Sequence, residues 1–520
     1  MIKDSRTSNS FYNLITGVFG QFLNIILQFV VRTVFISTLG KTVLGLSGLF
    51  SNILEMLSLA ELGVGSAILF KFYKPIAENN KKKLILLLRF YKKIYRVIGI
   101  IIACIGISLI PFLKFIVNDY NSVEYLGINI VLIYLLYLTR STISYFFLAY
   151  KSSIVKASQK EYKLNIIYYI VTILSSITQI VVLKLFGSFE LYVIVLILAV
   201  VLQNFLNSRI TKKLYPFIDD KCDEKLDKKE INDIFKDCGA LVLYRLNGVV
   251  LKATDNIVIS SFLGLNYVGL YSNYYILYTT INTFFSKIFE SVMHSLGNLH
   301  VTNNTNKEYE VFKTVNTISI IVGAVSGIGI ACVSDEFIKT WIGVEWIISK
   351  PFAILLGIEI YTLAIDQFLS KYRSAMGLFQ QAKMRPVFGS IINITLSIIL
   401  VNYFQISGVI IGTIIASWTT LMWYDPLIIF RHGFCNNYNI LEYYKKNILN
   451  FIAIVLIGAI SYLVCNNFFL NMGWVSVIIH SCISISITLV LYLMLFGRTN
   501  EIKNIKLLLT KILSRKKMVK

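Results

Sequence analysis

Fourteen mostly apolar stretches follow one another along the chain, separated by short polar segments. A transmembrane helix needs about 20 predominantly apolar residues, so each stretch predicts one spanning helix. Several connections are very short, which makes the neighbouring spans antiparallel helical hairpins. The predicted spans cover residues 11–37, 43–69, 94–117, 125–150, 164–185, 189–208, 238–262, 267–292, 312–333, 350–371, 386–403, 406–430, 447–468 and 472–497.

The overall composition agrees with this pattern. Of 520 residues, 56% are hydrophobic and only 15% are charged, and the mean hydropathy is +0.69. A soluble domain has roughly 25% charged residues, so the composition is typical of a membrane protein. The formal charge of +22 would favour nucleic-acid binding in a soluble protein. Here Lys and Arg are concentrated between the apolar stretches, so we expect no nucleic-acid partner.

The distribution of these basic residues predicts the orientation of the spans. If the chain starts on the cytoplasmic side, the cytoplasmic segments contain 41 of the 50 Lys and Arg residues, and the outer connections contain five. Cytoplasmic loops of membrane proteins carry this excess of positive charge. The sequence therefore predicts a multi-pass protein with both termini in the cytoplasm.

An internal repeat divides the chain at the charged segment 211–237. Residues 39–46 begin with Leu-Gly and end with Gly-Leu, and residues 263–270 do the same. Each copy follows a similar apolar run, at residues 32–37 and 255–260. Six spans per copy preserve the orientation, so the halves are expected to be parallel repeats about an axis along the membrane normal.

The predicted fold is an all-α integral membrane protein of about 14 transmembrane helices, with two six-helix lobes and a C-terminal helix pair. Two related bundles that face each other place a substrate site at their interface near the midplane, which favours transport over catalysis. The predicted boundaries are 1–210 for the first lobe, 211–237 for the inter-lobe loop, 238–433 for the second lobe, 434–500 for the helix pair and 501–520 for a basic cytoplasmic tail.

Polar residues within the spans predict a substrate cavity. A charge at a helix centre costs about 2.5–3.5 kcal/mol on insertion scales, so such residues usually face an interior cavity. Arg and Lys suit a phosphate-bearing headgroup because they supply charge and several hydrogen-bond donors. The alternative is structural pairing of acids and bases one helical turn apart. The predicted basic cavity comprises one helical face of the first span (Gln21, Asn24, Gln28 and Arg32) together with Arg140, Arg245 and Lys252.

Acidic residues within the spans are candidates for ion or proton coupling, and the alternative is that they balance nearby bases. Arg373 continues the heptad spacing of two of them, and its position near the inner interface allows it to snorkel toward water. The seven cysteines and four histidines show no metal-ligand spacing, so no metal site is expected. The coupling candidates are Glu55, Glu61, Asp255, Glu359 and Asp366.

Two parts of the sequence resemble a known family. Residues 54–67 (LEMLSLAELGVGSA), and residues 255–264 (DNIVISSFLG) followed by 268–272 (VGLYS), look like segments of bacterial polysaccharide repeat-unit flippases. These are the O-antigen and capsule transporters of the multidrug/oligosaccharidyl-lipid/polysaccharide exporter (MOP) superfamily. The similarity in span count, loop pattern and halves covers nearly the whole chain.

The resemblance implies a non-enzymatic function and a cellular location. It implies that the protein moves an undecaprenyl-diphosphate-linked oligosaccharide from the inner to the outer leaflet of the bacterial cytoplasmic membrane by alternating access. The expected partners are the lipid-linked oligosaccharide, membrane lipids, and a polysaccharide polymerase with other assembly proteins. No cofactor is expected, and coupling to a Na⁺ or H⁺ gradient stays open.

Two other functions remain as alternatives. The first is a cation-coupled multidrug or metabolite exporter of the same superfamily, which the basic residues within the spans disfavour. The second is a membrane polysaccharide polymerase or ligase, which the short outer loops disfavour.

Overall fold

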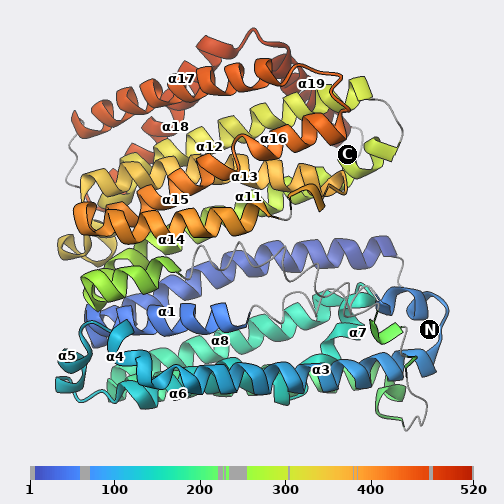
Figure 1. The fold of residues 1–520 in the computed structure, drawn as a ribbon, viewed down its shortest axis with the longest axis vertical. Helices are drawn as coiled ribbons and strands as arrows, with labels where there is room; N and C mark the ends of the chain where they lie inside the picture. Colours follow the sequence, from blue (N-terminus) through green and yellow to red (C-terminus); the bar gives the residue numbers. More distant parts are fainter. Residues whose placement is uncertain are drawn as a thin grey trace. The chain divides into compact units, whose positions relative to one another are not determined.

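The computed structural model describes residues 6–58, 71–220, 226–227, 230–232, 254–301, 305–378, 380–382, 384–467 and 472–517. These residues form helices and turns and include no strand, which confirms the predicted all-α fold. The chain divides into two compact units, unit 1 (Met1–Gly269) and unit 2 (Leu270–Lys520). Figure 1 shows each unit as a bundle of long helices.

The described helices identify a multi-pass membrane protein. Ten are long and apolar enough to cross a membrane, and an eleventh span is added if Ile130–Phe146 and Ala149–Ala157, bent by 47°, are taken together. The segment Phe19–Leu57 covers parts of the first and second predicted spans, and non-helical backbone at Gly40 separates the two. Most of the seventh predicted span lies outside the described residues. The structure is therefore compatible with fourteen spans.

The described part of unit 1 includes the long helices α1, α3, α6 and α8, labelled in Figure 1, and α9. α1 (Arg6–Leu57) packs against α8 (Glu161–Phe186), and α8 packs against α9 (Phe189–Leu214). α9 packs against α6 (Ile130–Phe146), which also contacts α1 and α3 (Lys81–Ser108). The closed order of contacts among α1, α8, α9 and α6 surrounds a central space. The connections contain the short helices η1 (Ile110–Phe112), α4 (Leu113–Ile116), α5 (Tyr120–Tyr125), η2 (Ala149–Lys151), α7 (Ser152–Ala157) and η3 (Pro216–Asp219).

Two glycines interrupt the helices at corresponding positions of the predicted repeat. Gly40 has a φ of 77° within α1, and Gly264 has a φ of 97° just before α11 (Leu265–Val301). Glycine adopts this left-handed conformation without the steric cost that a side chain imposes. Both breaks lie where the sequence predicts a short connection between spans. Both copies of the repeat therefore have a glycine with a positive φ at the helix break.

The glycines five residues beyond these breaks bring the two copies into contact. A Cβ added at Gly45 would lie 2.0 Å from the carbonyl oxygen of Leu265. A Cβ added at Gly269 would lie 2.5 Å from the carbonyl oxygen of Lys41. Each glycine thus packs against the carbonyl four residues before the other, and only a residue without a side chain permits this approach.

Residues 254–269 belong to unit 1 by their contacts. The Ser260 hydroxyl donates to the Ile116 carbonyl at 2.8 Å, and the backbone N–H of Leu265 donates to Asp119 Oδ2 at 2.8 Å. The sequence places these residues in the second lobe. Because most of the segment between the predicted lobes lies outside the described residues, the lobe boundaries stay a prediction.

Unit 2 is organised around α12 (Thr305–Ile342), which packs along α13 (Lys350–Ala375). A Cβ on either Gly327 or Gly357 would lie 2.5 Å from the carbonyl oxygen of the other, so these glycines set the close spacing of the two helices. Unit 2 also includes most of α11, together with α14 (Arg385–Phe404), α15 (Ile406–Thr420), α16 (Tyr424–Ile428), α17 (Ile440–Asn467) and α18 (Trp474–Phe496), and the short turns η4 (Val344–Trp346), η5 (Gln380–Ala382) and η6 (Ile429–Gly433).

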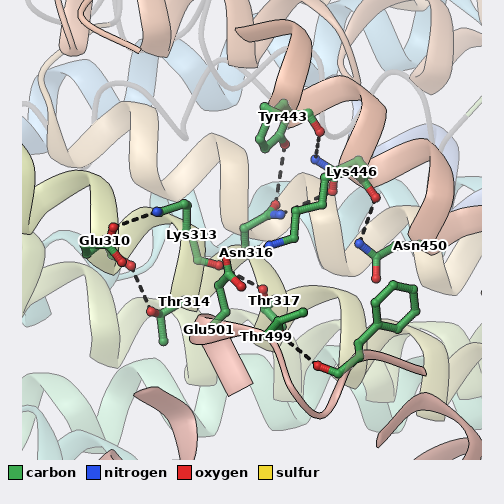
Figure 2. Close-up of polar contacts among 12 residues, drawn as sticks. Glu310, Lys313, Thr314, Asn316, Thr317, Tyr443, Lys446, Asn450, Thr499 and Glu501 are labelled. Carbon is green, nitrogen blue, oxygen red and sulfur yellow. Dashed lines mark hydrogen bonds and ion pairs between the residues drawn. The ribbon is translucent and has the colours of Figure 1, made fainter. Parts of the chain in front are cut away.

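The last helix, α19 (Asn500–Lys517), is attached to unit 2 by a polar network (Figure 2). Glu501 forms an ion pair with Lys446 of α17 at 2.6 Å. Nearby, the Asn316 amide of α12 donates to Asn447 Oδ1 at 3.2 Å. The sequence predicts only a basic tail here, whereas the structure forms a helix whose first turn is anchored.

Candidate functional site

The polar face predicted for the first span lines a cavity of about 470 Å³ inside unit 1. Asn24, Gln28 and Arg32, which follow one another at helical spacing on α1, all contribute to its wall. Gln21 lies one turn earlier on α1 and is not among the lining residues. Helical periodicity therefore brings three of the four predicted side chains to one site.

Arg140 of α6 lines the same cavity. Tyr192 of α9 interacts electrostatically with both Arg32 and Arg140, so the two guanidinium groups approach one part of the cavity. Phe35 of α1 packs edge-on against Tyr192, with the ring centroids 4.9 Å apart, and supports the tyrosine ring beside the arginines.

The cavity also has polar side chains that are not predicted from the sequence, Tyr192 among them. Tyr137 lies one turn from Arg140 on α6, and its hydroxyl shares a hydrogen bond of 2.6 Å with the Ser47 hydroxyl of α1. On α8, the Gln179 amide donates to the Ser175 hydroxyl at 2.7 Å. The helical spacing of Tyr137 and Arg140 places both on one face of α6 and could have indicated Tyr137 as a cavity residue. The chain has 31 tyrosines, however, and the sequence does not show which of them line the cavity.

The charged side chains among the described lining residues of the cavity are all positive. These lining residues include two arginines and no aspartate or glutamate. Like charges in a poorly solvated site repel each other, so an approaching anion lowers their energy. Arginine donates hydrogen bonds in a planar fork that matches phosphate oxygens. The arrangement favours an anionic ligand with several oxygen acceptors, and the Gln, Ser, Thr and Tyr side chains can bind its hydroxyl groups.

Some predicted site residues are absent from this cavity or from the described residues. Arg245, Lys252 and Glu61 lie outside the described residues. Glu55 is exposed on α1 and does not line the cavity.

The other acidic candidates are distributed over the two units. Asp255 is 5% exposed in unit 1, and Glu359 and Asp366 are half-buried on α13 of unit 2. The Ser370 hydroxyl donates to Asp366 Oδ1 at 2.9 Å. Within the described part of the chain, no group of three or more His, Cys, Asp or Glu side chains is arranged to hold a metal ion. The role of these acids in ion coupling stays a prediction.

Arg373 does not snorkel toward water, so that alternative is wrong. Its side chain is 1% exposed and pairs with Asp425 at 3.4 Å. The carboxylate of Asp425 also pairs with Arg385 at 2.9 Å, and Arg373 Nη1 donates to the Leu378 carbonyl at 3.0 Å. The acid that neutralises these bases comes from α16, so the spacing of residues along α13 gives no sign of it.

Part of the chain is similar to a known family. Residues 94–351 match the model of a family described as polysaccharide biosynthesis protein. No curated protein sequence matches the chain significantly.

Solved transporter structures share the fold. The lipid II flippase MurJ in an inward closed conformation superposes with a TM-score of 0.66 at 16% identity, covering 93% of this chain and 99% of that one. An inward-facing multidrug resistance MATE family transporter of the MOP superfamily gives 0.59 at 14% identity, covering 78% and 94%. A MATE structure in complex with MaL6 gives 0.54 at 14% identity, covering 81% and 96%.

At these identities, the structural likeness establishes the fold alone. The family match adds the link to polysaccharide biosynthesis, and both agree with the resemblance seen in the sequence. Over residues 94–351 the chain is therefore similar to a polysaccharide biosynthesis family, and its fold is that of the MurJ flippase and of MATE transporters.

Proposed function

We propose that this chain moves undecaprenyl-diphosphate-linked oligosaccharide repeat units from the inner to the outer leaflet of the bacterial cytoplasmic membrane, for surface polysaccharide synthesis. The observation that carries the proposal is the cavity of unit 1, in which Arg32 and Arg140 lie with no acid among the described lining residues. A diphosphate has several charged oxygens, and two guanidinium groups supply matching charge and donors.

The size of the cavity indicates which part of the substrate it holds. A volume of about 470 Å³ is within the range of small-molecule sites, roughly 300–1,000 Å³. It therefore receives the diphosphate and the adjoining sugar, while the remaining sugars and the lipid lie elsewhere. Tyr137, Tyr192 and Gln179 provide a flat surface and hydrogen-bonding groups for a sugar ring.

Transport by alternating access requires the contact between the repeat copies to open. Gly45 and Gly269 pack closely there, and the Thr42 hydroxyl donates to Asn266 Oδ1 at 2.9 Å. The charge pattern predicts that this contact is on the outer side of the membrane. Its opening releases the substrate to the outer leaflet, where a polysaccharide polymerase uses it. The energy comes from a Na⁺ or H⁺ gradient, and no bound cofactor is needed.

The cavity is tested with the double variant Arg32→Gln, Arg140→Gln in liposomes that contain a defined fluorescent lipid-linked oligosaccharide. Hydrogen bonds to charged groups contribute about 1.5–3 kcal/mol each, so the flipping rate at limiting substrate is expected to fall about 100-fold or more. The matched control is Lys184→Gln, Arg209→Gln, which removes two positive charges from exposed positions on α8 and α9 outside the cavity.

The control is expected to flip at the wild-type rate. Unchanged flipping by the cavity variant, with an unchanged protein level, would show that the cavity is not the substrate site.

The opening step is tested separately with Thr42→Cys, Asn266→Cys in a background without the natural cysteines. The side-chain oxygens of this pair are 2.9 Å apart, so oxidation is expected to form a disulfide. Flipping should stop on oxidation and return on reduction. Full activity of the cross-linked protein would contradict the opening of this contact during transport.

The similarity to a MATE transporter supports a second candidate function, cation-coupled export of drugs or metabolites. The two arginines of the cavity disfavour cationic cargo, because they repel it at the binding site. Cation-dependent export of a cationic dye by the reconstituted protein, without flipping of the lipid-linked oligosaccharide, would favour this alternative.

A further inference from the structure

Unit 2 contains an apolar groove of about 410 Å³ between α12, α13 and α17. Its floor is formed by small residues of α12, including Gly327 and Ala331. Ile354 of α13 and Leu463 of α17 are 40% and 61% exposed at its rim, so the groove opens on the outer surface of membrane-spanning helices. Its described lining residues include none with a charge.

Small residues keep the groove open. Gly458 of α17 lines it, and a Cβ at this position would lie 3.5 Å from Ile328 Cγ1 of α12, which is ordinary van der Waals distance. A larger side chain at position 458 would therefore extend into the groove.

An aromatic cluster closes one end of the groove. The Phe451 ring of α17 is 5.7 Å from the Tyr361 ring of α13 and 4.8 Å from the Trp418 ring of α15, measured between centroids. From Lys350 at the start of α13 to Tyr361 the helix rises about 16 Å, at 1.5 Å per residue. The hydrocarbon core of a bilayer is about 30 Å thick. The groove thus reaches to about the depth of one leaflet.

The other end of the groove joins a charged pocket of about 180 Å³, and the two share Ala331 and Tyr462. Charges of both signs line this pocket. They are Asp335, Glu336 and Lys339 near the end of α12 and Lys350 at the start of α13. The charged groups therefore lie at helix ends, at the level where lipid headgroups meet the protein.

Neighbouring helices hold the two carboxylates of the pocket. The Tyr274 hydroxyl of α11 donates to Asp335 Oδ1 at 2.6 Å. Glu336 Oε2 is 2.5 Å from His480 Nδ1 of α18. In each acid, one carboxylate oxygen therefore contacts a neighbouring helix, and the residue also lines the pocket.

We propose that the groove and the pocket together bind one glycerophospholipid with an amine-bearing headgroup. One acyl chain lies along the groove and ends at Phe451. The phosphate lies near Lys339 and Lys350, and the amine lies near Asp335 and Glu336. The charge pattern argues for this occupant, because a headgroup with both signs matches a pocket with both signs. A purely anionic headgroup would meet the two carboxylates without a compensating amine. The proposal does not depend on the transported substrate.

The test uses the full-length protein in detergent and native mass spectrometry with three lipids: phosphatidylethanolamine, phosphatidylglycerol and undecaprenyl phosphate. We expect one retained phosphatidylethanolamine per protein, bound about tenfold more tightly than phosphatidylglycerol, as one well-formed ion pair provides. The variant Gly458→Leu should weaken its binding about tenfold, because the new side chain displaces about two buried methylenes of the lipid.

The matched control is Leu456→Phe, which adds bulk at an exposed position of α17 that does not line the groove, and it should bind as the wild type does. Asp335→Asn preserves the size of the side chain and should reduce the preference for phosphatidylethanolamine over phosphatidylglycerol toward one. This ratio decides the matter if Gly458→Leu fails to fold. Equal binding of the two phospholipids to the wild type, or displacement of phosphatidylethanolamine by undecaprenyl phosphate, would overturn the proposal.

Discussion

The two units accommodate basic side chains in opposite ways. In unit 1, Arg32 and Arg140 line a cavity whose described walls include no acid. In unit 2, the buried carboxylate of Asp425 lies between Arg373 and Arg385, at 3.4 and 2.9 Å. The same residue type is thus directed toward a cavity in one unit and neutralised in the interior of the other.

This difference distinguishes a binding role from a structural one. A buried ion pair contributes little net stability because desolvation offsets the attraction, but removal of one partner leaves an uncompensated charge. A base that lines a cavity can contact a ligand there, so its removal is expected to affect binding more than folding. The following predictions test this contrast, from the largest expected effect to the smallest.

Asp425→Ala should destabilise the protein by about 3–5 kcal/mol, because it leaves two guanidinium groups buried without their shared carboxylate. The measurement is reversible unfolding in detergent, followed by circular dichroism. Glu442→Ala, which removes an exposed acid of unit 2, should change stability by less than about 0.5 kcal/mol. Equal effects of the two variants would mean that the buried triad is not a structural element.

The close glycine contacts of the units should respond differently to a methyl group. Gly357→Ala in unit 2 should cost about 1–3 kcal/mol, because α12 and α13 must separate to accept it. Gly45→Ala in unit 1 overlaps Leu265 in the same way, but opening of the repeat contact relieves the overlap. We expect it to reduce stability less and to alter the flipping rate more. Similar losses of stability with unchanged flipping would show that the unit 1 contact is permanent.

Arg140→Gln alone should lower the flipping rate at limiting substrate about tenfold, the effect of losing one charge-assisted hydrogen bond of about 1.5 kcal/mol. Its unfolding temperature should stay that of the wild type. Arg385→Gln in unit 2 should do the reverse and lower the unfolding temperature, because it removes a base paired with a buried acid. A stability loss from Arg140→Gln alone, without a change in flipping, would remove the distinction between the units.

The smallest effect concerns two acids outside the spans, one in each unit. The hydrogen bond from Lys151 lowers the pKa of Asp219, opposed by partial burial. Burial acts to raise the pKa of Glu501, but the hydrogen bond and charge of Lys446, a backbone hydrogen bond and the charge of Lys313 together outweigh it, so the pKa is lowered. Carboxyls with a lowered pKa in the folded state stabilise it above their ordinary pKa values, 3.8 and 4.5, and lose this contribution as the pH falls through the lowered values.

At pH values below about 4, the unfolding temperature is therefore expected to decrease. Asp219→Asn and Glu501→Gln should each make this decrease smaller. The same decline in both variants and the wild type would show that these ion pairs do not contribute to the acid response.

The sequence by itself determined the all-α membrane fold, the in-span position of the charges and the glycine breaks of the repeat. These features are local. Apolar length specifies a span, and helical periodicity places Asn24, Gln28 and Arg32 on one face. The Leu-Gly pair that begins each copy of the repeat marks the break, at Gly40 and at Gly264.

Only the tertiary structure decided what each face meets. Tyr192 lies beside Arg32 although 160 positions separate them, and Asp425 pairs with Arg373 from a different helix. Periodicity selects the side of a helix, but the packing of helices far apart in the sequence selects the neighbour on that side. Arg32 and Arg373 are the same residue type in the sequence. Arg32 nevertheless lines a cavity in unit 1, whereas Arg373 forms a buried ion pair in unit 2.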